Sequence, residues 1–527
     1  MVILIGDITH DKYRSSQVKH VTHLRQYDNS VINGDVIEFL GHAWIHDTNG
    51  AVTEDICTGW RSVGDPVCDG ALAAVFESPS SSVGKDLLAS VENYARDNPS
   101  SQEVQPFLDE VTSSPPDDII ASEREIQIAQ DFFVDHSVQI MQALLHYSLA
   151  GGFASPRIMR TLQAVSYLVT PGNKKSHPDD LGRSNKQADD RAFARLLETL
   201  QFVLDVMACT QPGDAARGNK SPLEELLPGG EGWKSAVRVR LLHGIARRRA
   251  SERLRRTSSS ESNMDVPVSQ EDMAATLGAF CIIPLWSLKR LGLAPHPEQE
   301  RAYLALWRHV GFYLGVSPDI LRRYFVEPRV GDLFLVTMVL DLFSEHDAYE
   351  ASVSSSHSGA TLAILRAISD RPLGRTSLEY NCAVTRVLVG DPLADHLGLP
   401  SSSLTMTAAV YWKAFVASIQ TRFGYWYPRR AWLQKRRAVF REGLVRGVIW
   451  SLDMRQATFR PRTEVEGDGG AEIGEGVKEE EKVLLEYAGA VRLMKLWKEV
   501  LVEMVVVTCA VATIPTATVA WFWLKRR

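Results

Sequence analysis

Cysteine is scarce in this chain, with six residues in 527, and no two of them form a CxxC pair. This scarcity argues against a disulfide framework and a zinc ribbon, and it suits a reducing compartment. Two catalytic motifs are also absent: the GxxxxGK[ST] phosphate loop and the GxSxG nucleophile elbow. The N-terminus has neither a basic stretch nor an apolar run long enough for a secretory signal. These absences exclude P-loop nucleotide hydrolysis and nucleophile-elbow hydrolysis as functions.

Negative charge is concentrated in one segment rather than spread along the chain. Thr463–Glu481 holds eight acidic residues and one lysine, so the rest of the chain is close to neutral despite the net charge of −6. Nucleic-acid-binding proteins usually carry a clear positive surface. We therefore expect no nucleic-acid partner.

A long run without charge lies at the C-terminal end. Met504–Leu524 contains 21 uncharged residues and is followed by three basic ones. As an α-helix it would be about 31 Å long, enough to cross the hydrocarbon core of a bilayer. We predict a single-pass membrane anchor over 504–524, with its orientation left open. Pro515 and the many β-branched residues keep a buried helix, or one lying on the surface, as the alternative.

The remaining pattern is helical, without the alternation that marks sheets. Glu123–Leu149 and Ala192–Met207 have apolar residues at helical spacing, and Ser155 and Ser269 are predicted N-caps of two further helices. We expect loops at Ala351–Ala360 and Asp391–Leu404. The predicted fold is mainly α, a single large helical domain.

Four parts are predicted along the chain. They are an N-terminal extension (1–60), a helical domain (61–460), an acidic linker (461–485) and an anchor region (486–527). Tyr411–Met454 is basic and aromatic, a composition found where proteins meet nucleic acid or anionic lipid. Beside a membrane anchor, lipid contact or a plain structural use is the better interpretation.

One histidine lies among unusually small neighbours on a basic helix. On the face of His243, the positions one turn away include Val239 and Ala246, and Arg240 and Arg247 flank the imidazole. This arrangement leaves room for a flat ligand with acidic groups, such as a haem with its propionates. A buried histidine with a satisfied hydrogen bond is the structural alternative.

Two further groups of polar residues are candidate sites. Arg195, Glu198 and Thr199 share one helical stripe, which could line a polar pocket or form an ordinary surface ion pair. His42 and His46 have metal-compatible i, i+4 spacing, but no third ligand is evident.

Several blocks along the chain, taken in order, resemble the family of haem-dependent oxygenases that contains the latex-clearing rubber oxygenases and the fungal ER-bound MpaB-type oxygenase. The resemblance covers about residues 60–330. The blocks are Gly64–Pro66, Leu149–Leu168, Arg195–Thr199, Val239–Arg247, Pro267–Phe280 and Arg301–Val316.

The resemblance implies an all-helical, globin-reminiscent fold that holds b-type haem. By this resemblance His243 matches the axial iron ligand, with Arg240 and Arg247 as cofactor-binding neighbours, while Arg195 and Thr199 match residues that line the haem pocket. Some rubber oxygenases have a lysine where this chain has Glu198, so a lysine-closed resting state is not expected here. The family's catalytic carboxylate has no clear equivalent. The candidates are Asp179, Asp180, Asp189 and Asp190.

The function implied is that of a membrane-anchored haem oxygenase, with the endoplasmic reticulum as the expected location. It would use O2 to cleave a C=C bond in an apolar, isoprenoid-like substrate. The alternative is a non-catalytic helical scaffold tethered to a membrane, with or without haem.

Overall fold

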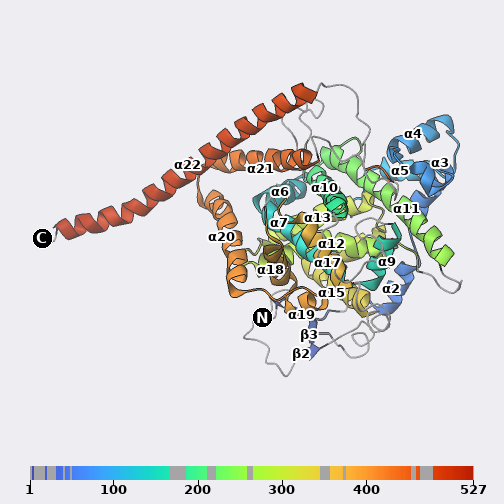
Figure 1. Ribbon diagram of the computed structural model, residues 1–527, viewed down its shortest axis with the longest axis horizontal. Coiled ribbons are helices and arrows are strands. Elements are labelled where there is room, and N and C mark those ends of the chain that lie inside the picture. Colours follow the sequence, from blue (N-terminus) through green and yellow to red (C-terminus); the bar gives the residue numbers. More distant parts are fainter. Residues whose placement is uncertain are drawn as a thin grey trace.

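Helix α12 (Gln270–Arg290) runs through the middle of a helical body in the computed structural model of the chain (Figure 1). The structure describes residues 50–165, 186–209, 221–257, 265–344, 357–371, 375–452, 459–462 and 479–525, together with short stretches of the first 47 residues. Ser269 caps α12 through the predicted capping box with Asp272. Most side chains of α12 are buried all around its circumference, as expected of a central core helix.

The other helices surround α12 in layers. Helices α2, α7, α13 and α15 pack directly against it, as does the π-helical segment η3, while α13 also packs on α6 and α10 packs on α11 and α17. The helices up to the centre are α2 (Glu54–Arg61), α3 (Pro66–Val75), α4 (Leu87–Asp97), α5 (Gln105–Val111), α6 (Glu123–Asp135), α7 (Ser137–Ala143), η3 (Leu144–Leu149), α8 (Ala150–Gly152), α9 (Pro156–Val165), α10 (Lys186–Val206) and α11 (Glu231–Thr257). Those after it are α13 (Pro297–Tyr313), α14 (Pro318–Tyr324), α15 (Pro328–Ser344), α17 (His357–Ile368), α18 (Leu378–Val389), α19 (Asp391–His396), α20 (Leu404–Trp426), α21 (Arg430–Ser451) and α22 (Glu479–Lys525). Two short 3₁₀ helices, η2 (Pro79–Ser82) and η6 (Glu224–Leu226), complete the helical set among the described residues.

A small sheet lies beside the helices, where the sequence indicated no element. Its strands are β1 (Ile3–Leu4), β2 (Val18–His20), β3 (Val36–Phe39) and β4 (His42–Ile45), in the order β1-β4-β3-β2. β3 and β4 are antiparallel, and the outer strands pair in parallel with them. His42 therefore lies in a strand, and four residues of extended chain put its Cα about 13 Å from that of His46. The helical spacing on which a shared metal ion would depend is therefore not found here.

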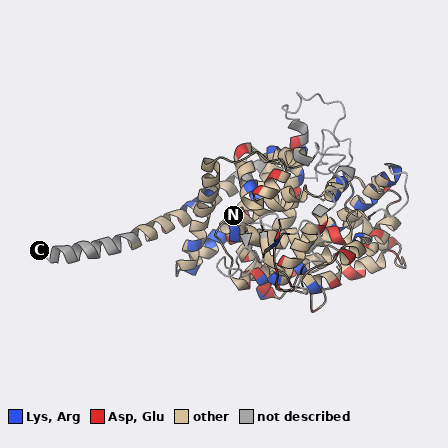
Figure 2. Cartoon of the chain, turned by 90° about the horizontal axis from the view of Figure 1, so that it is seen from below, with Lys and Arg blue, Asp and Glu red and all other residues tan. Residues whose placement is uncertain are grey.

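The prediction of a mainly α fold is confirmed, with two local corrections. Asp391–His396, expected to be a loop, forms α19, and α17 begins inside the expected loop Ala351–Ala360. Both helices pack against α18. Contacts with other elements, rather than local signals in the sequence, therefore stabilise these segments as helices. Charged residues of both signs are spread over the body, in keeping with the near-neutral charge outside the acidic segment (Figure 2).

The predicted C-terminal membrane anchor is not supported by the structure. Within the described part of the chain, α12 is the helix that is long and apolar enough to cross a membrane, and it is largely buried in the core. The predicted span, Met504–Leu524, falls in the last part of α22, and the side chains there are described only as far as Val511. The long apolar run thus makes a helix, and its membrane role stays a prediction.

Candidate functional site

A large cavity of about 960 Å³ lies among the central helices. Its wall is mainly apolar, with contributions from η3, α9, α10, α11, α12 and α20. A cavity of this size and character is typical of a site for a large apolar ligand or cofactor. Four residues singled out in the sequence line it: Arg195, Glu198, Thr199 and His243.

His243 lies on α11 at the edge of this cavity. Its Nδ1 atom is buried and has no hydrogen-bond partner, while the side chain keeps some accessible surface on the cavity side. Burial, helped by the positive charge of Arg247, lowers the pKa of His243 to about 4, so the imidazole is neutral at physiological pH. The alternative of a histidine with a satisfied hydrogen bond is therefore not what the structure shows. A neutral imidazole facing an apolar cavity suits an axial ligand of haem iron.

The residues of α11 that share the cavity lie to one side of His243. Val239, Leu242 and Ala246 line it together with His243, and so does Arg249. At roughly 100° per residue these positions form one continuous stripe of the helix. Val239 and Ala246, the small neighbours noted in the sequence, thus line the cavity, and so do the larger Leu242 and Ile245.

Arg240 and Arg247 lie on the other side of His243 and do not line the cavity. The Arg240 guanidinium donates two hydrogen bonds to Asp65, at 2.7 and 3.0 Å, and a third to Glu110 at 2.7 Å. Arg247 pairs with Asp69 and donates to the carbonyl oxygen of Val268. One-turn spacing placed both arginines close to His243, but the acidic residues of α3 and its N-cap turn them away from the cavity. Arg249, also on α11, is a cavity-side cation that the sequence did not single out.

The polar stripe of α10 faces the same cavity. Arg195 pairs with Glu198 at 3.0 Å, and Glu198 also pairs with Arg462. The Thr199 hydroxyl donates to the carbonyl oxygen of Arg195 at 3.3 Å. Glu198 is buried, with an exposed fraction of 7%. The stripe thus lines the cavity, as the first interpretation expected, and Arg195 and Glu198 also form the ion pair of the second.

Two cavity residues gave no signal in the sequence. His146 belongs to η3, a π-helical segment, and such segments are frequent at functional sites. Its Nδ1 lies 2.9 Å from the Thr385 hydroxyl, and burial lowers its pKa to about 3. Asp272, the capping residue of α12, also reaches the cavity, and burial raises the pKa of its carboxyl. Single residues of this kind have no spacing that would reveal them.

Two of the four candidate carboxylates can be placed in the structure. Asp179 and Asp180 lie outside the described residues. Asp189 and Asp190 line a separate small pocket, and Asp190 pairs with Arg371 at 2.6 Å. Neither lines the large cavity.

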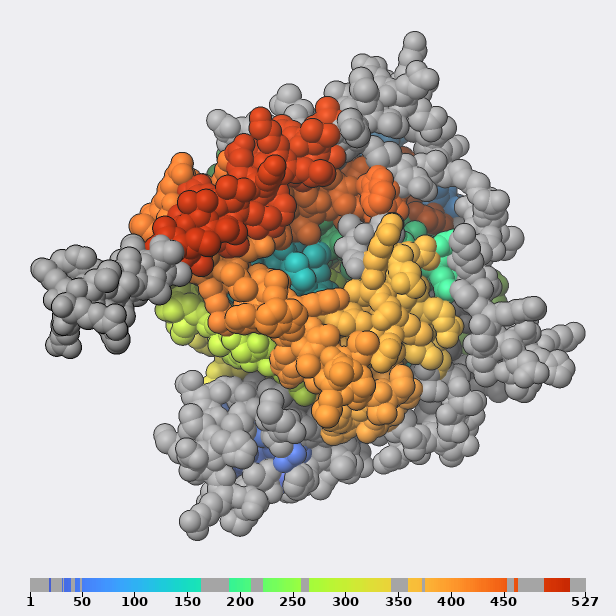
Figure 3. All heavy atoms as spheres, turned by 60° about the vertical axis from the view of Figure 1, so that its left-hand side comes forward, coloured from blue at the N-terminus to red at the C-terminus, as the bar shows by residue number. Residues whose placement is uncertain are grey.

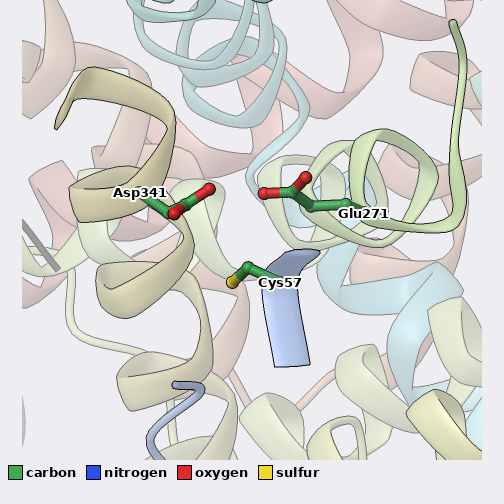
Figure 4. A group of neighbouring side chains, drawn as sticks. All are labelled: Cys57, Glu271 and Asp341. Atoms are coloured by element: carbon green, nitrogen blue, oxygen red, sulfur yellow. The ribbon is translucent and has the colours of Figure 1, made fainter. Parts of the chain in front are cut away.

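A second cluster, near the cavity but apart from it, brings Cys57, Glu271 and Asp341 together (Figure 4). One ligand-type atom from each lies within 4.8 Å of the others. Arg61 binds both carboxylates, and Arg157 binds Glu271 at 2.5 Å. Burial, with the negative charge of Glu271, holds the pKa of the Asp341 carboxyl well above its usual range. Two guanidinium groups already supply the positive charge, so the cluster is an acid–arginine network that joins α2, α9, α12 and α15 rather than a cation site.

A mainly helical body with a large apolar cavity, and with a neutral histidine in the cavity wall, defines a class of protein suited to a large planar cofactor. The sequence model of the family described as "ER-bound oxygenase mpaB/B'/Rubber oxygenase, catalytic domain" matches residues 139–421. The match covers more than half of the chain, and it includes all the cavity-lining residues of α10 and α11. The chain therefore belongs to this family. It is accordingly an oxygenase by family, an enzyme of the oxidoreductase class.

One solved structure shows a limited likeness to the chain. The structure titled "Structure of Latex Clearing Protein LCP in the closed state" is similar over 74% of this chain and 91% of that chain, with 17% sequence identity and a TM-score of 0.44. No curated protein sequence matches the chain.

Proposed function

We propose that the chain is a b-type haem oxygenase that cleaves a C=C bond of an apolar, isoprenoid-like substrate with O2. The observation that carries this proposal is the buried, unpartnered Nδ1 of His243 in the wall of a large apolar cavity. A buried polar atom without a partner costs free energy, and such an atom often belongs to a side chain that binds a ligand or ion. Family membership supplies the class of chemistry.

The residues present fit the cofactor. His243 would hold the iron as a neutral imidazole, and the stripe of small residues beside it would give the macrocycle clearance. Arg249 lies on the cavity side of the same helix, and its guanidinium donates to the carbonyl oxygens of Arg462 and Pro79. Its positive charge is placed to neutralise acidic substituents, whereas Arg240 and Arg247 are paired with acidic residues of the protein. Haem, when bound, supplies the O2 chemistry, as cofactors generally do.

The chain's own contribution is a dry, shaped cavity with one polar wall. The apolar lining excludes water and accommodates an isoprenoid chain. Arg195 and Thr199 provide a cation and a hydroxyl on that wall, suited to orienting a polar group formed at the reacting carbons. Glu198 is engaged by Arg195 and Arg462, so its role is to fix the guanidinium of Arg195 rather than to bind iron.

Membrane association belongs to the same proposal. The family description names an ER-bound oxygenase, and an apolar substrate partitions into lipid. The single-pass anchor over Met504–Leu524 stays a prediction within it.

Absorption spectroscopy of the full-length, detergent-purified protein tests the haem assignment. The wild type is expected to show a Soret band, and His243→Ala is expected to lose it while keeping its helical circular dichroism. His146→Gln, which changes another cavity histidine, is the matched control and should keep the band. A wild type that takes up no haem on reconstitution contradicts the proposal, and a band lost only in the His146 variant moves the ligand to that residue.

Turnover needs a separate measurement. Haem-loaded protein is expected to consume O2 together with the double bonds of a prenylated substrate. A loaded protein that consumes neither would be a haem-binding scaffold without oxygenase activity.

A further inference from the structure

Helix α20 carries most of its large apolar side chains outward. Trp412 and Trp426 are each at least 60% exposed, and Phe415 is 47% exposed. A helix on the surface of a soluble protein normally buries such residues and exposes polar ones. The buried positions of α20 are instead Val410, Ala414, Ser418, Thr421, Phe423 and Gly424.

The exposed apolar surface is continuous along the helix. Tyr411, Val416 and Ile419 are all more than a third exposed and belong to the same outer side of α20. Contiguous apolar surface of this kind marks an interaction site for a partner or a membrane. It is not a groove, because the residues project from a single convex helix.

The charges of α20 favour a lipid partner. Between Leu404 and Trp426 there is no acidic residue, and the charged residues are Lys413 and Arg422, both exposed. Arg429 and Arg430 follow immediately and are exposed as well. Tryptophan and tyrosine combined with lysine and arginine, without acidic residues, is the composition of helices that lie in a membrane interface.

The neighbouring helix α22 extends this surface. Trp432 of α21 donates to the Val500 carbonyl oxygen of α22 at 3.0 Å, and Glu503 accepts from Tyr427 and Arg429. These contacts fix the direction in which α22 leaves the body, and α20 lies at the edge of the body from which it projects (Figure 1). Beyond the contacts α22 exposes more apolar side chains, those of Val502, Val505, Val506 and Val511.

The inner side of α20 is a wall of the cavity. Lys413, Ala414 and Ala417 line it, directly behind the outward-facing Trp412 and Val416. The exposed Val138 of α7 lines it too. In the space-filling view the surface is hollowed beside α20, and teal atoms of the segment that contains α7 are visible there (Figure 3). The outer apolar surface and the cavity are thus separated by the thickness of one helix.

We propose that the outer face of α20, together with Val502–Val511 of α22, docks on a lipid bilayer, so that apolar substrate reaches the cavity from the membrane beside α20. The docking surface does not depend on haem, on turnover or on a membrane-spanning tail. The delivery of substrate rests on the proposed function. Anionic headgroups meet Arg422 and Arg429, while the aromatic side chains enter the interface.

Site-specific fluorescence on the full-length protein tests the surface. In a Cys509→Ser background, which removes the exposed cysteine, Trp412→Cys and Phe415→Cys are labelled separately with an environment-sensitive dye. The control is Glu92→Cys on α4, which lies at the opposite end of the body (Figure 1). The probes are phosphatidylcholine vesicles with and without phosphatidylserine, each also prepared with acyl-chain spin labels.

The labels at positions 412 and 415 are expected to shift to the blue on vesicle addition and to lose emission with the spin-labelled lipid. The label at position 92 should change in neither way. Protein that floats with the vesicles while the two α20 labels stay unchanged is held by its tail alone, and this result overturns the proposal. Labels that are already shifted without lipid, and that dilution returns to the red, identify a second copy of the chain as the occupant and overturn it as well.

A combined Trp412→Ser/Phe415→Ser variant tests whether substrate reaches the cavity from the membrane through this face. It is expected to keep its haem spectrum and its turnover of a short, detergent-dispersed prenyl substrate, and to lose turnover of the same substrate supplied in vesicles. Equal loss in both assays contradicts delivery through this face. Absence of haem in the wild type would remove the proposed function and leave the fluorescence result intact.

Discussion

Glu198 forms an ion pair with Arg462, although 264 positions separate the two residues in the chain. Arg462 belongs to Phe459–Arg462, a short segment after α21 that lines the cavity. The backbone N–H of Gly84 donates to the carbonyl oxygen of Pro461 at 2.8 Å, which ties the segment to the loop before α4. The polar wall of α10 is therefore completed by the C-terminal part of the domain.

Loss of the Glu198 carboxylate should destabilise the protein. Glu198→Ala removes an acceptor that both Arg195 and Arg462 contact, and we expect a loss of about 1–2 kcal/mol in the free energy of unfolding. Arg462→Ala should cost less, below about 1 kcal/mol, because the Arg462 side chain is 46% exposed to screening solvent. Urea unfolding of both variants and of the double variant gives the coupling energy. Strictly additive effects would show that the pair does not interact.

Arg240 is expected to matter for stability rather than for ligand binding. Its side chain is almost fully buried against Asp65 and Glu110, so Arg240→Met leaves buried carboxylates without their cation and should cost about 3–5 kcal/mol. Adding Asp65→Leu should restore part of that loss. Thermal and urea unfolding measure both. A normally stable Arg240→Met protein with impaired haem uptake would return Arg240 to the cofactor site.

Gly244 permits the close approach of α11 to α3. A Cβ atom there would lie 2.5 Å from Leu72 Cδ1 and 3.1 Å from Cys68 Sγ. Gly244→Ala should therefore lower the free energy of unfolding by about 1–3 kcal/mol through overpacking. Gly59→Ala in α2 is the matched control, since no atom lies within 4 Å of its added Cβ. It should stabilise by about 0.5–1 kcal/mol through helix propensity. Equal effects at the two positions would refute the packing argument.

Asp332 makes stability depend on pH. Burial raises the pKa of Asp332 to about 6, and its carboxylate accepts from Trp286 Nε1 at 2.7 Å. Because the folded-state pKa lies above the unfolded value, the folded protein holds more protons between about pH 4 and 6. The free energy of unfolding therefore keeps the full contribution of Asp332 below about pH 4. It falls by at most about 3 kcal/mol as the pH rises through 6.

Asp332→Asn keeps an acceptor for Trp286 and removes the buried charge. It should raise the unfolding midpoint at pH 7.5 and have little effect at pH 4. Denaturant titrations at the two pH values, with Asp319→Asn as an exposed control, decide the matter. A variant that is less stable than the wild type at pH 7.5 contradicts the assigned cause.

Local signals in the sequence predicted the elements that depend on neighbours in the chain. The capping box of Ser269 and Asp272 and the helical spacing of Ala192–Met207 both correspond to observed helices, α12 and α10. The short strands and α19 escaped prediction, because elements of a few residues owe their stability to partners distant in sequence. The positions of Val239 and Ala246 beside His243 were predictable, since both lie within one turn of the histidine.

What the sequence determined by itself is which residues share a helix face, because that depends only on helical periodicity. It placed His243, Arg195 and Thr199 among the candidate site residues, and all three line one cavity. Only the tertiary structure decided which side chains of other elements each helix face contacts. Arg240 and Arg247 flank His243 as expected, yet acidic residues of α3 and its N-cap hold them outside the cavity, and Arg462 reaches Glu198 from the far end of the domain. Ion pairing across the fold depends on distances that sequence separation does not encode.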